Sequence, residues 1–226
     1  MFGHGVLVPS YRKRTAYQAM LLGGMATLAS AVLVLGDLET RDDIALRHAE
    51  DLKASLSQVL PDAVHDNDLL SDVLTLPPEQ PGAKPLKIYR AHLDNRISAV
   101  AYEVSSNGYA GPVTCIMGVA ANGEILGVRV LAHAETPGLG DKIEIAKDRW
   151  ITSFDGHSLE NTDSKQWHVK KDGGVFDQFT GATITPRAVV KAVHEGLAVF
   201  DANRAAILSS ATPDADPTNE GGKDHE

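Results

Sequence analysis

Residues 112–132, PVTCIMGVAANGEILGVRVLA, predict a β-hairpin that sets the character of the fold. Two strands, 112–120 and 124–132, flank Ala121-Asn122-Gly123, and Asn-Gly is a typical hairpin turn. Alternate side chains of a strand share one face. On the first strand that face carries Val113, Cys115, Met117 and Val119, opposite Thr114, Ile116 and Gly118. We therefore expect an antiparallel pair in which Cys115 is a small core residue.

The sequence before this hairpin extends the sheet. Residues 86–92 and 97–104 predict two further strands, joined through Asp94-Asn95. The folded domain is expected to cover residues 86–204.

The sequence after the hairpin supplies helices. Residues 142–154 predict a helix with Ile143, Ala146, Trp150 and Ile151 on one side, and 167–171 predict a short edge strand. In the final helix Thr185 is the expected cap and Pro186 the first helical residue. Its buried stripe is Val190, Val193, Leu197 and Phe200. An antiparallel sheet with flanking helices is an α+β fold.

Residues 15–36, TAYQAMLLGGMATLASAVLVLG, carry no charge and predict a transmembrane helix. At ~1.5 Å per residue such a helix spans the ~30 Å hydrocarbon layer. Three basic residues, 12–14, precede it, and an acidic excess follows it in 37–43. Because basic flanks stay in the cytoplasm, we expect residues 1–14 inside and everything after Gly36 outside.

Two alternatives are open for this apolar segment. A cleaved signal peptide would use Ala29-Ser30-Ala31 as its cleavage signal, and a soluble protein would bury the segment as a core helix. Cleavage would leave residues 32–35 as a bare apolar end, and no lipobox cysteine is present. The sequence therefore favours a membrane anchor.

Between the anchor and the domain, residues 37–85 are expected to form a stalk helix and a linker. Thr40 can cap a helix that ends at Leu60, just before a proline. Residues 61–85 are rich in Pro, Asp and Gly without lasting periodicity, which indicates a linker. At the other end of the chain, 205–226 loses its pattern and predicts a disordered tail.

Composition excludes several classes of function. The 226 residues hold 21 Lys and Arg against 30 Asp and Glu, so we expect no nucleic-acid binding. The single cysteine excludes an intrachain disulfide, a CxxC pair and a thiolate metal site. His133 and Glu135 lack a third ligand, so no metal site is expected, and the other histidines are expected at the surface. Any redox chemistry must therefore use an organic cofactor.

Three loops carry the candidate chemistry: 107–112 (NGYAGP), 133–142 (HAETPGLGDK) and 177–186 (DQFTGATITP). In the second, small residues around Leu139 let backbone N–H groups approach a ligand, although an ordinary glycine-rich turn has the same composition. The third places hydroxyl and acid groups before a helix N-terminus, which stabilises a phosphate, although an ordinary capped helix start looks the same. These groups are Asp177, Thr180, Thr183 and Thr185, with Lys170, Lys171 and Arg187 as additional charge.

Together the three loops resemble a known family. The quartet Thr180-Gly181-Ala182-Thr183, with Asp177 upstream, is similar to the flavinylation motif of the covalent FMN-binding domain, and the other two loops are similar to its remaining hallmark segments. With the N-terminal anchor, their order and spacing resemble the G subunit of Rnf electron transport complexes. The C subunit of the sodium-pumping NADH:quinone oxidoreductase shares the domain and is the alternative.

The resemblance implies a covalently bound FMN. Its phosphate would be esterified to the side-chain oxygen of Thr183 by a flavin transferase that uses FAD as donor. The residues that would shape the phosphate end are Thr180, Gly181, Ala182 and Thr185, and those that would border the isoalloxazine ring are Glu135, Thr136, Leu139 and Gly140.

The resemblance further implies a membrane-anchored electron carrier with no substrate turnover of its own. It would pass electrons between other membrane subunits of a redox-driven, ion-translocating complex of the ferredoxin:NAD oxidoreductase type. The complex would lie in a bacterial inner membrane, with this domain on the periplasmic side. No catalytic residue is expected, because the flavin supplies the chemistry. A non-redox interaction module outside the cytoplasm is the competing function, and no GxSxG elbow or cysteine-histidine couple indicates a hydrolase or transferase.

Overall fold

The computed structural model describes residues 15–78 and 85–209, except for the side chains of 38–39, 41–46 and 48–49. The chain forms two units, Met1–Asp51 and Leu52–Glu226. The predicted cytoplasmic segment 1–14 lies outside the described residues.

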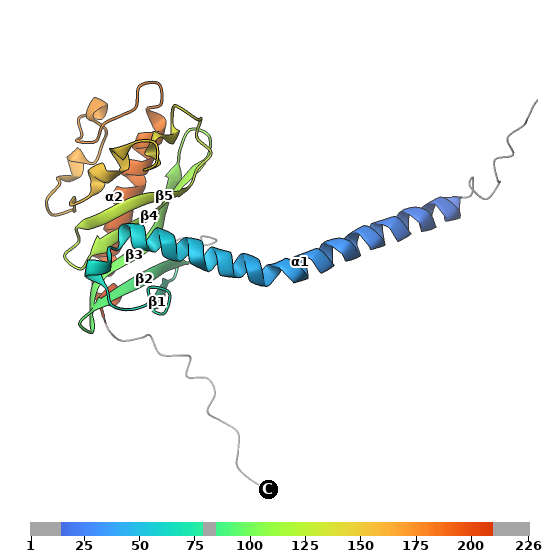
Figure 1. The fold of residues 1–226 in the computed structure, drawn as a ribbon. Helices are drawn as coiled ribbons and strands as arrows, with labels where there is room; N and C mark the ends of the chain where they lie inside the picture. The colour runs from blue at the N-terminus through green and yellow to red at the C-terminus, as the bar shows by residue number, and fades with distance from the viewer. Residues whose placement is uncertain (1–14, 79–84, 210–226) are drawn as a thin grey trace, which may run out of the picture. The chain divides into compact units, whose positions relative to one another are not determined.

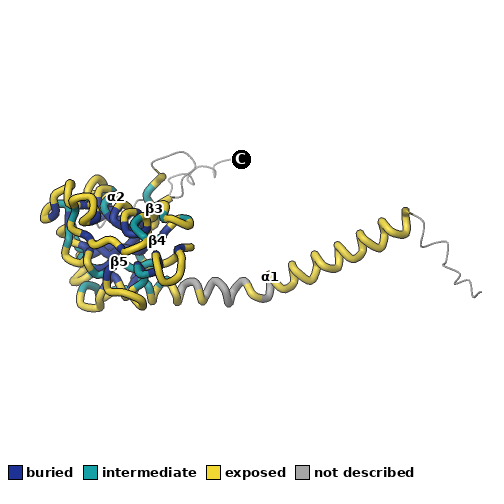
Figure 2. The backbone as a smooth tube through the Cα atoms, turned by 90° about the horizontal axis from the view of Figure 1, so that it is seen from above, coloured by how far each residue is buried: buried dark blue, intermediate teal, exposed yellow. Residues whose placement is uncertain are grey.

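The N-terminal unit is helical where it is described. Helix α1 spans Thr15–Val59, and its first part, Thr15–Asp37, has a mean hydropathy of 2.0 with none of its residues buried. Figure 2 shows this stretch exposed along its whole length. By length and composition it can cross a membrane.

A separate stalk helix capped by Thr40 is not what the structure shows. The helix is continuous through this position, and the Thr40 hydroxyl donates to the carbonyl of Gly36, 2.9 Å away, instead of capping a new N-terminus. The sequence between the apolar segment and Leu60 contains no proline, so nothing in it interrupts the backbone ladder. The predicted end of the helix before Pro61 is confirmed.

The second unit contains a five-stranded antiparallel sheet in the order β1-β2-β3-β4-β5 (Figure 1). The strands are β1 (Val73–Leu76), β2 (Leu86–Leu93), β3 (Arg96–Asn107), β4 (Pro112–Ala120) and β5 (Ile125–Ala132). The predicted hairpin of β4 and β5 is confirmed. The predicted turn at Asp94 and Asn95 is also confirmed. Its φ angles of 52° and 62° are tolerated best by glycine, asparagine and aspartate.

Residues 61–85 are more than a linker. Within them β1 pairs with β2, with Val73 opposite Tyr89 and Leu76 opposite Leu86, and Leu69 is buried in the core. A four-residue strand is too short to show periodicity, and β1 forms because the edge of β2 offers it a partner. Residues 79–84 lie outside the described part.

The sheet is covered on both faces (Figure 1). Helix α2 (Ile184–Ile207) covers one face and contributes the four predicted stripe residues to the larger core. The last turns of α1, from Leu52 on, cover the other face, where a Cβ on Gly118 would collide with the backbone carbonyl of Val59. Cys115 is fully buried, and burial raises the pKa of its thiol to about 12, which fits an inert core residue.

The connection from β5 to α2 is irregular, and two predicted elements are wrong there. In place of a helix over 142–154 there are two 3-10 helices, η3 (Asp141–Ile143) and η4 (Arg149–Phe154), and Ala146 is exposed. The side chain of Asp148 accepts a hydrogen bond from the N–H of Trp150 and so caps the N-terminus of η4. In place of an edge strand over 167–171, an isolated bridge joins Val169 to Phe176 between two further 3-10 helices, η5 (Ser164–Gln166) and η6 (Lys170–Asp172).

Helix α2 also differs from its prediction at both ends. Thr183 occupies the N-cap position, so Thr185 and Pro186 lie in the first turn. Proline is tolerated there because first-turn N–H groups have no intrahelical acceptor. At the C-terminus the helix continues to Ile207, which is fully buried, so the predicted tail begins too early. Its remainder, from residue 210, lies outside the described residues.

Candidate functional site

The three loops singled out from the sequence meet around one cavity of about 300 Å³. It is lined by Tyr109, Glu135, Thr136, Leu139, Gly140, Gly181, Ala182, Thr183, Ile184 and Thr185. Of the residues predicted to contact the flavin, all except Thr180 line this cavity, whereas Asp177 and the three basic residues named with it do not. The sequence missed Tyr109 and Ile184, although both lie within the quoted loops. Their signal was a large apolar side chain between small residues.

Each loop is shaped by a tight turn. In the first, the N–H of Gly108 donates to Gly111 O at 2.7 Å. In the second, the N–H of Gly140 donates to Thr136 O at 3.1 Å, and Gly138 has φ of +78°. The third loop places Gly181 at φ of +86°, the left-handed region that glycine adopts at little cost. These turns aim backbone and small side chains at the cavity.

Glu135 joins the three loops. Its side chain is buried, with the residue only 5% exposed. Oε1 accepts from the N–H groups of Tyr109 (2.9 Å) and Ala110 (3.0 Å), in the loop between β3 and β4. Oε2 accepts from the hydroxyl of Thr185, in the first turn of α2. We call these three hydrogen bonds the Glu135 clasp.

Two glycines leave room for this carboxylate. A Cβ on Gly108 would lie 2.5 Å from Glu135 Oε1. A Cβ on Gly140 would lie 2.8 Å from Glu135 Oε2 and 2.9 Å from Thr185 Oγ1. Gly140 has φ of −84°, an ordinary value, so space and not backbone conformation requires a glycine there.

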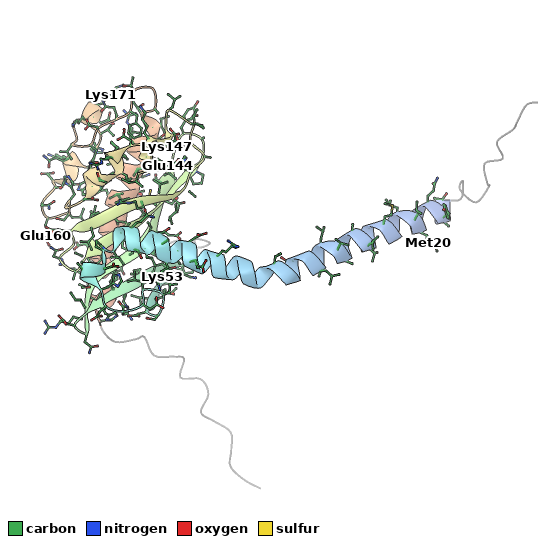
Figure 3. The ribbon with its side chains drawn as sticks, in the orientation of Figure 1. Met20, Lys53, Glu144, Lys147, Glu160 and Lys171 are labelled. Atoms are coloured by element: carbon green, nitrogen blue, oxygen red, sulfur yellow. The ribbon has the colours of Figure 1, made fainter. Side chains whose placement is uncertain are left out.

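His133 contacts the backbone of the clasp residue Glu135. Its Nδ1 accepts from the N–H of Glu135 at 3.0 Å, so Nε2 carries the proton and donates to Glu144 Oε1 at 2.9 Å. Lys147 contacts both Glu144 and Asp141, and Figure 3 shows Lys147 beside Glu144. Hydrogen bonds from Lys147 and His133 lower the pKa of Glu144. The main cause that lowers the pKa of Asp141 is its hydrogen bond from Lys147.

These contacts account for His133 and Glu135 without a metal. Within the described ranges, no group of three His, Cys, Asp or Glu side chains could hold a metal ion. The side chain of His133 is 14% exposed and works as an internal hydrogen-bonding group.

The three threonines of the third loop differ in how available they are. Thr185 is fully buried and its hydroxyl is bonded to Glu135. Thr180 is exposed and does not line the cavity. Thr183 is half-buried, lines the cavity and makes no capping hydrogen bond to α2. Of these three residues, Thr183 is therefore the one that lines the cavity without a hydrogen bond from its hydroxyl to Glu135 or to α2.

Two of the three basic residues expected to add charge, Lys170 and Arg187, are paired with acids instead. Lys170 pairs with Asp177 at 2.7 Å. Arg187 makes two hydrogen bonds to Asp172, at 2.6 and 2.8 Å. Neither basic side chain lines the cavity, so a bound anion there would depend on the N-terminus of α2.

The lining suits a flavin mononucleotide in its chemistry. Tyr109, Leu139 and Ile184 are exposed apolar side chains around the cavity, as a planar aromatic ring requires. The first turn of α2 offers the N–H groups and helix-dipole end that favour a phosphate.

Comparison with known proteins identifies the family of this chain. Residues 108–198 match the family model of the FMN-binding domain. The chain is 50% identical to the G subunit of the ion-translocating oxidoreductase complex of Cereibacter sphaeroides (strain ATCC 17023), over 86% of this chain and 88% of that one. It is 45% identical to the subunit of the same name from Stutzerimonas stutzeri, over 90% and 88%.

A solved structure is more distantly similar. The crystal structure of Shewanella oneidensis NqrC has a TM-score of 0.44 and 23% identity, covering 65% of this chain and 72% of that one. The identities of 45 to 50% over most of the chain decide the family. The chain belongs to the family of G subunits of ion-translocating oxidoreductase complexes and carries the FMN-binding domain of that family.

Proposed function

We propose that this chain is a membrane-anchored flavoprotein that relays electrons between partner subunits of an ion-translocating oxidoreductase complex. The observation that carries the proposal is the cavity, where apolar side chains, a helix N-terminus and Thr183, whose hydroxyl makes no capping hydrogen bond, lie together. FMN supplies one- and two-electron transfer, and the protein supplies position and electrostatics. No substrate turnover by this chain alone is proposed.

The FMN is proposed to be covalent, through the side-chain oxygen of Thr183. A flavin transferase would use FAD: the Thr183 oxygen attacks the phosphorus of the FMN half, an O–P bond forms, and the pyrophosphate P–O bond breaks. AMP leaves, and the hydroxyl proton passes to a base of the transferase or to water. The remaining phosphodiester carries one negative charge, which the α2 N-terminus stabilises by roughly 0.3 to 1 kcal/mol.

The other residues of the cavity would hold the flavin. Gly181 and Ala182 give the phosphate end close backbone contact, and a Cβ on Gly181 would come within 3.5 Å of Leu139. Thr136, Leu139 and Gly140 lie on the second loop, where a ring can rest on apolar surface. A covalent bond prevents loss of the cofactor outside the cytoplasm whatever its affinity.

Mass spectrometry tests the covalent proposal directly. The full chain is produced with and without a flavin transferase and weighed intact. We expect a gain equal to FMN minus water only with the transferase, and flavin fluorescence that survives denaturing electrophoresis. Bleaching by dithionite would establish redox activity, whereas a colourless protein made alongside the transferase would favour the non-redox interaction module.

The anchor is proposed to cross the inner membrane once, with the FMN-binding domain on the periplasmic side. The support is the charge distribution, with basic residues 12–14 before the apolar segment and acidic residues after it. Ser164 is exposed, so Ser164→Cys in a Cys115→Ala background gives one accessible thiol. An impermeant maleimide should label it from the periplasm. Labelling only after the inner membrane is broken would contradict this orientation.

A further inference from the structure

We propose that Glu135 is a positioning residue that prepares Thr183 for flavin attachment, by holding the loop between β3 and β4 and the first turn of α2 in place before any cofactor arrives. This inference rests on the proposed function, and it assigns to Glu135 a role other than bordering the flavin ring.

The geometry shows both carboxylate oxygens already engaged. Oε1 accepts from two backbone N–H groups and Oε2 accepts from a buried hydroxyl, so neither oxygen points free into the cavity. A buried carboxylate is costly without such partners, and here all of them are neutral donors. Neutral donors fix the position of a charge without an ion pair.

The clasp connects parts of the chain that are far apart in sequence. Thr185 is 50 residues from Glu135, and Tyr109 is 26 residues from it. Both partners stand beside the cavity, Tyr109 as an exposed ring and Thr185 as the buried neighbour of Thr183. The clasp therefore determines the distance between the loop that carries Tyr109 and Thr183, the residue proposed to receive FMN.

The clasp also distinguishes the two threonines at the start of α2. The hydroxyl of Thr185 is buried and donates its hydrogen bond to Glu135, so it is not available for attachment. Thr183 has no such partner and lines the cavity. Glu135 thus leaves one hydroxyl of the pair available to the transferase.

The test measures the rate of FMN incorporation into the purified full chain, in detergent, with transferase and FAD. Glu135→Ala removes all three bonds and should slow incorporation by about tenfold or more, since hydrogen bonds to charged groups are strong. Glu135→Gln keeps the shape: its amide oxygen can accept from both N–H groups, and its amide N–H can donate to the Thr185 hydroxyl, so it should stay within about threefold of wild type. Glu135→Asp keeps the charge but is one methylene shorter, and should behave like Glu135→Ala.

Two controls separate positioning from general damage. Asp72→Asn changes another hydrogen-bonded carboxylate, in the segment before β1, and should leave incorporation unchanged. Thr185→Val should slow incorporation. Adding it to Glu135→Ala should bring no further loss of rate, because both substitutions break the same hydrogen-bonded clasp.

Hydrogen exchange gives a readout that needs no flavin. In the unloaded full chain, the amides of Tyr109 and Ala110 should be protected in wild type and Glu135→Gln, and should exchange rapidly in Glu135→Ala. Wild-type incorporation by Glu135→Ala, or a Glu135→Gln protein as slow as Glu135→Ala, would overturn the inference. A wild-type chain that takes up no FMN would instead overturn the proposed function, and the exchange result would still decide whether the clasp exists.

Discussion

Two buried charges, Glu135 and Arg90, hold the second unit together in opposite ways. Arg90 is 3% exposed and donates to Asp72 at 2.6 Å and to the carbonyl of Ser209 at 3.0 Å. Asp72 also contacts His92 Nε2 at 2.5 Å. Arg90 therefore ties β2 to the segment before β1 through an ion pair, and to Ser209, just after α2, through a hydrogen bond. Glu135 ties its three loops through neutral donors alone.

The difference shows what each arrangement is suited to. An ion pair between a buried cation and a carboxylate fastens two segments, and it weakens when the carboxylate is protonated. The Glu135 carboxylate, held by backbone N–H groups and a hydroxyl, fixes the positions of the loops around it, and the cavity lies beside it. We expect changes at Arg90 and Asp72 to affect stability, and changes around Glu135 to affect flavin loading.

The largest expected effect is at Thr183. Thr183→Val removes the only cavity-lining hydroxyl of the third loop that is not already bonded, and should abolish the FMN mass increment completely. Thr180→Val alters an exposed residue outside the cavity lining and should retain the increment. Intact-mass measurement with the transferase decides between them. Flavin retained by Thr183→Val would place the linkage elsewhere.

The next largest effect is expected at Gly140. Gly140→Val places carbon atoms where the Glu135 carboxylate and the Thr185 hydroxyl lie, so it should displace the clasp and strongly reduce flavin loading. Gly127→Ala is the matched control, because its nearest atom would be 3.4 Å away, an ordinary contact. Flavin content is measured on both, with thermal unfolding to show that the domain is folded. Equal loading would mean that the loop tolerates the displacement.

A moderate effect on stability alone is expected at Asp72. Asp72→Ala leaves the buried guanidinium of Arg90 without its acidic partner, which should cost about 1 to 3 kcal/mol of unfolding free energy. Denaturant unfolding of the full chain measures this cost. Flavin incorporation should match wild type, and a parallel loss of incorporation would show that the two regions are coupled.

The smallest expected effect is a dependence on pH at the same residue. Burial acts to raise the pKa of Asp72, but hydrogen bonds from Arg90 and His92 hold it below the ordinary value of 3.8. A lowered folded-state pKa gives stability that is present above the unfolded pKa and lost as the pH falls through the folded one. The stability advantage of wild type over Asp72→Asn should therefore shrink below about pH 4. An advantage that is constant from pH 7 to pH 3 would contradict this assignment.

Elements with strong local signals were predictable from the sequence. The Asn-Gly turn and alternating apolar residues identify the β4–β5 hairpin, and the apolar stripe identifies α2. The helix over 142–154 was wrong because periodicity does not detect the new start that Asp148 makes at η4. Strand β1 escaped prediction because four residues become a strand only beside the edge of β2.

Of the site, the sequence by itself determined which loops carry glycine, threonine and small residues, and that the third loop leads into a helix. Turn residues and capping patterns act within a few positions of the chain, so they can be recognised there. Only the tertiary structure decided that Glu135 bonds to Thr185, that the Thr183 hydroxyl makes no capping hydrogen bond, and that Tyr109 and Ile184 line the cavity. The availability of a side chain depends on partners up to 50 residues away, which only the folded sheet and helix bring together.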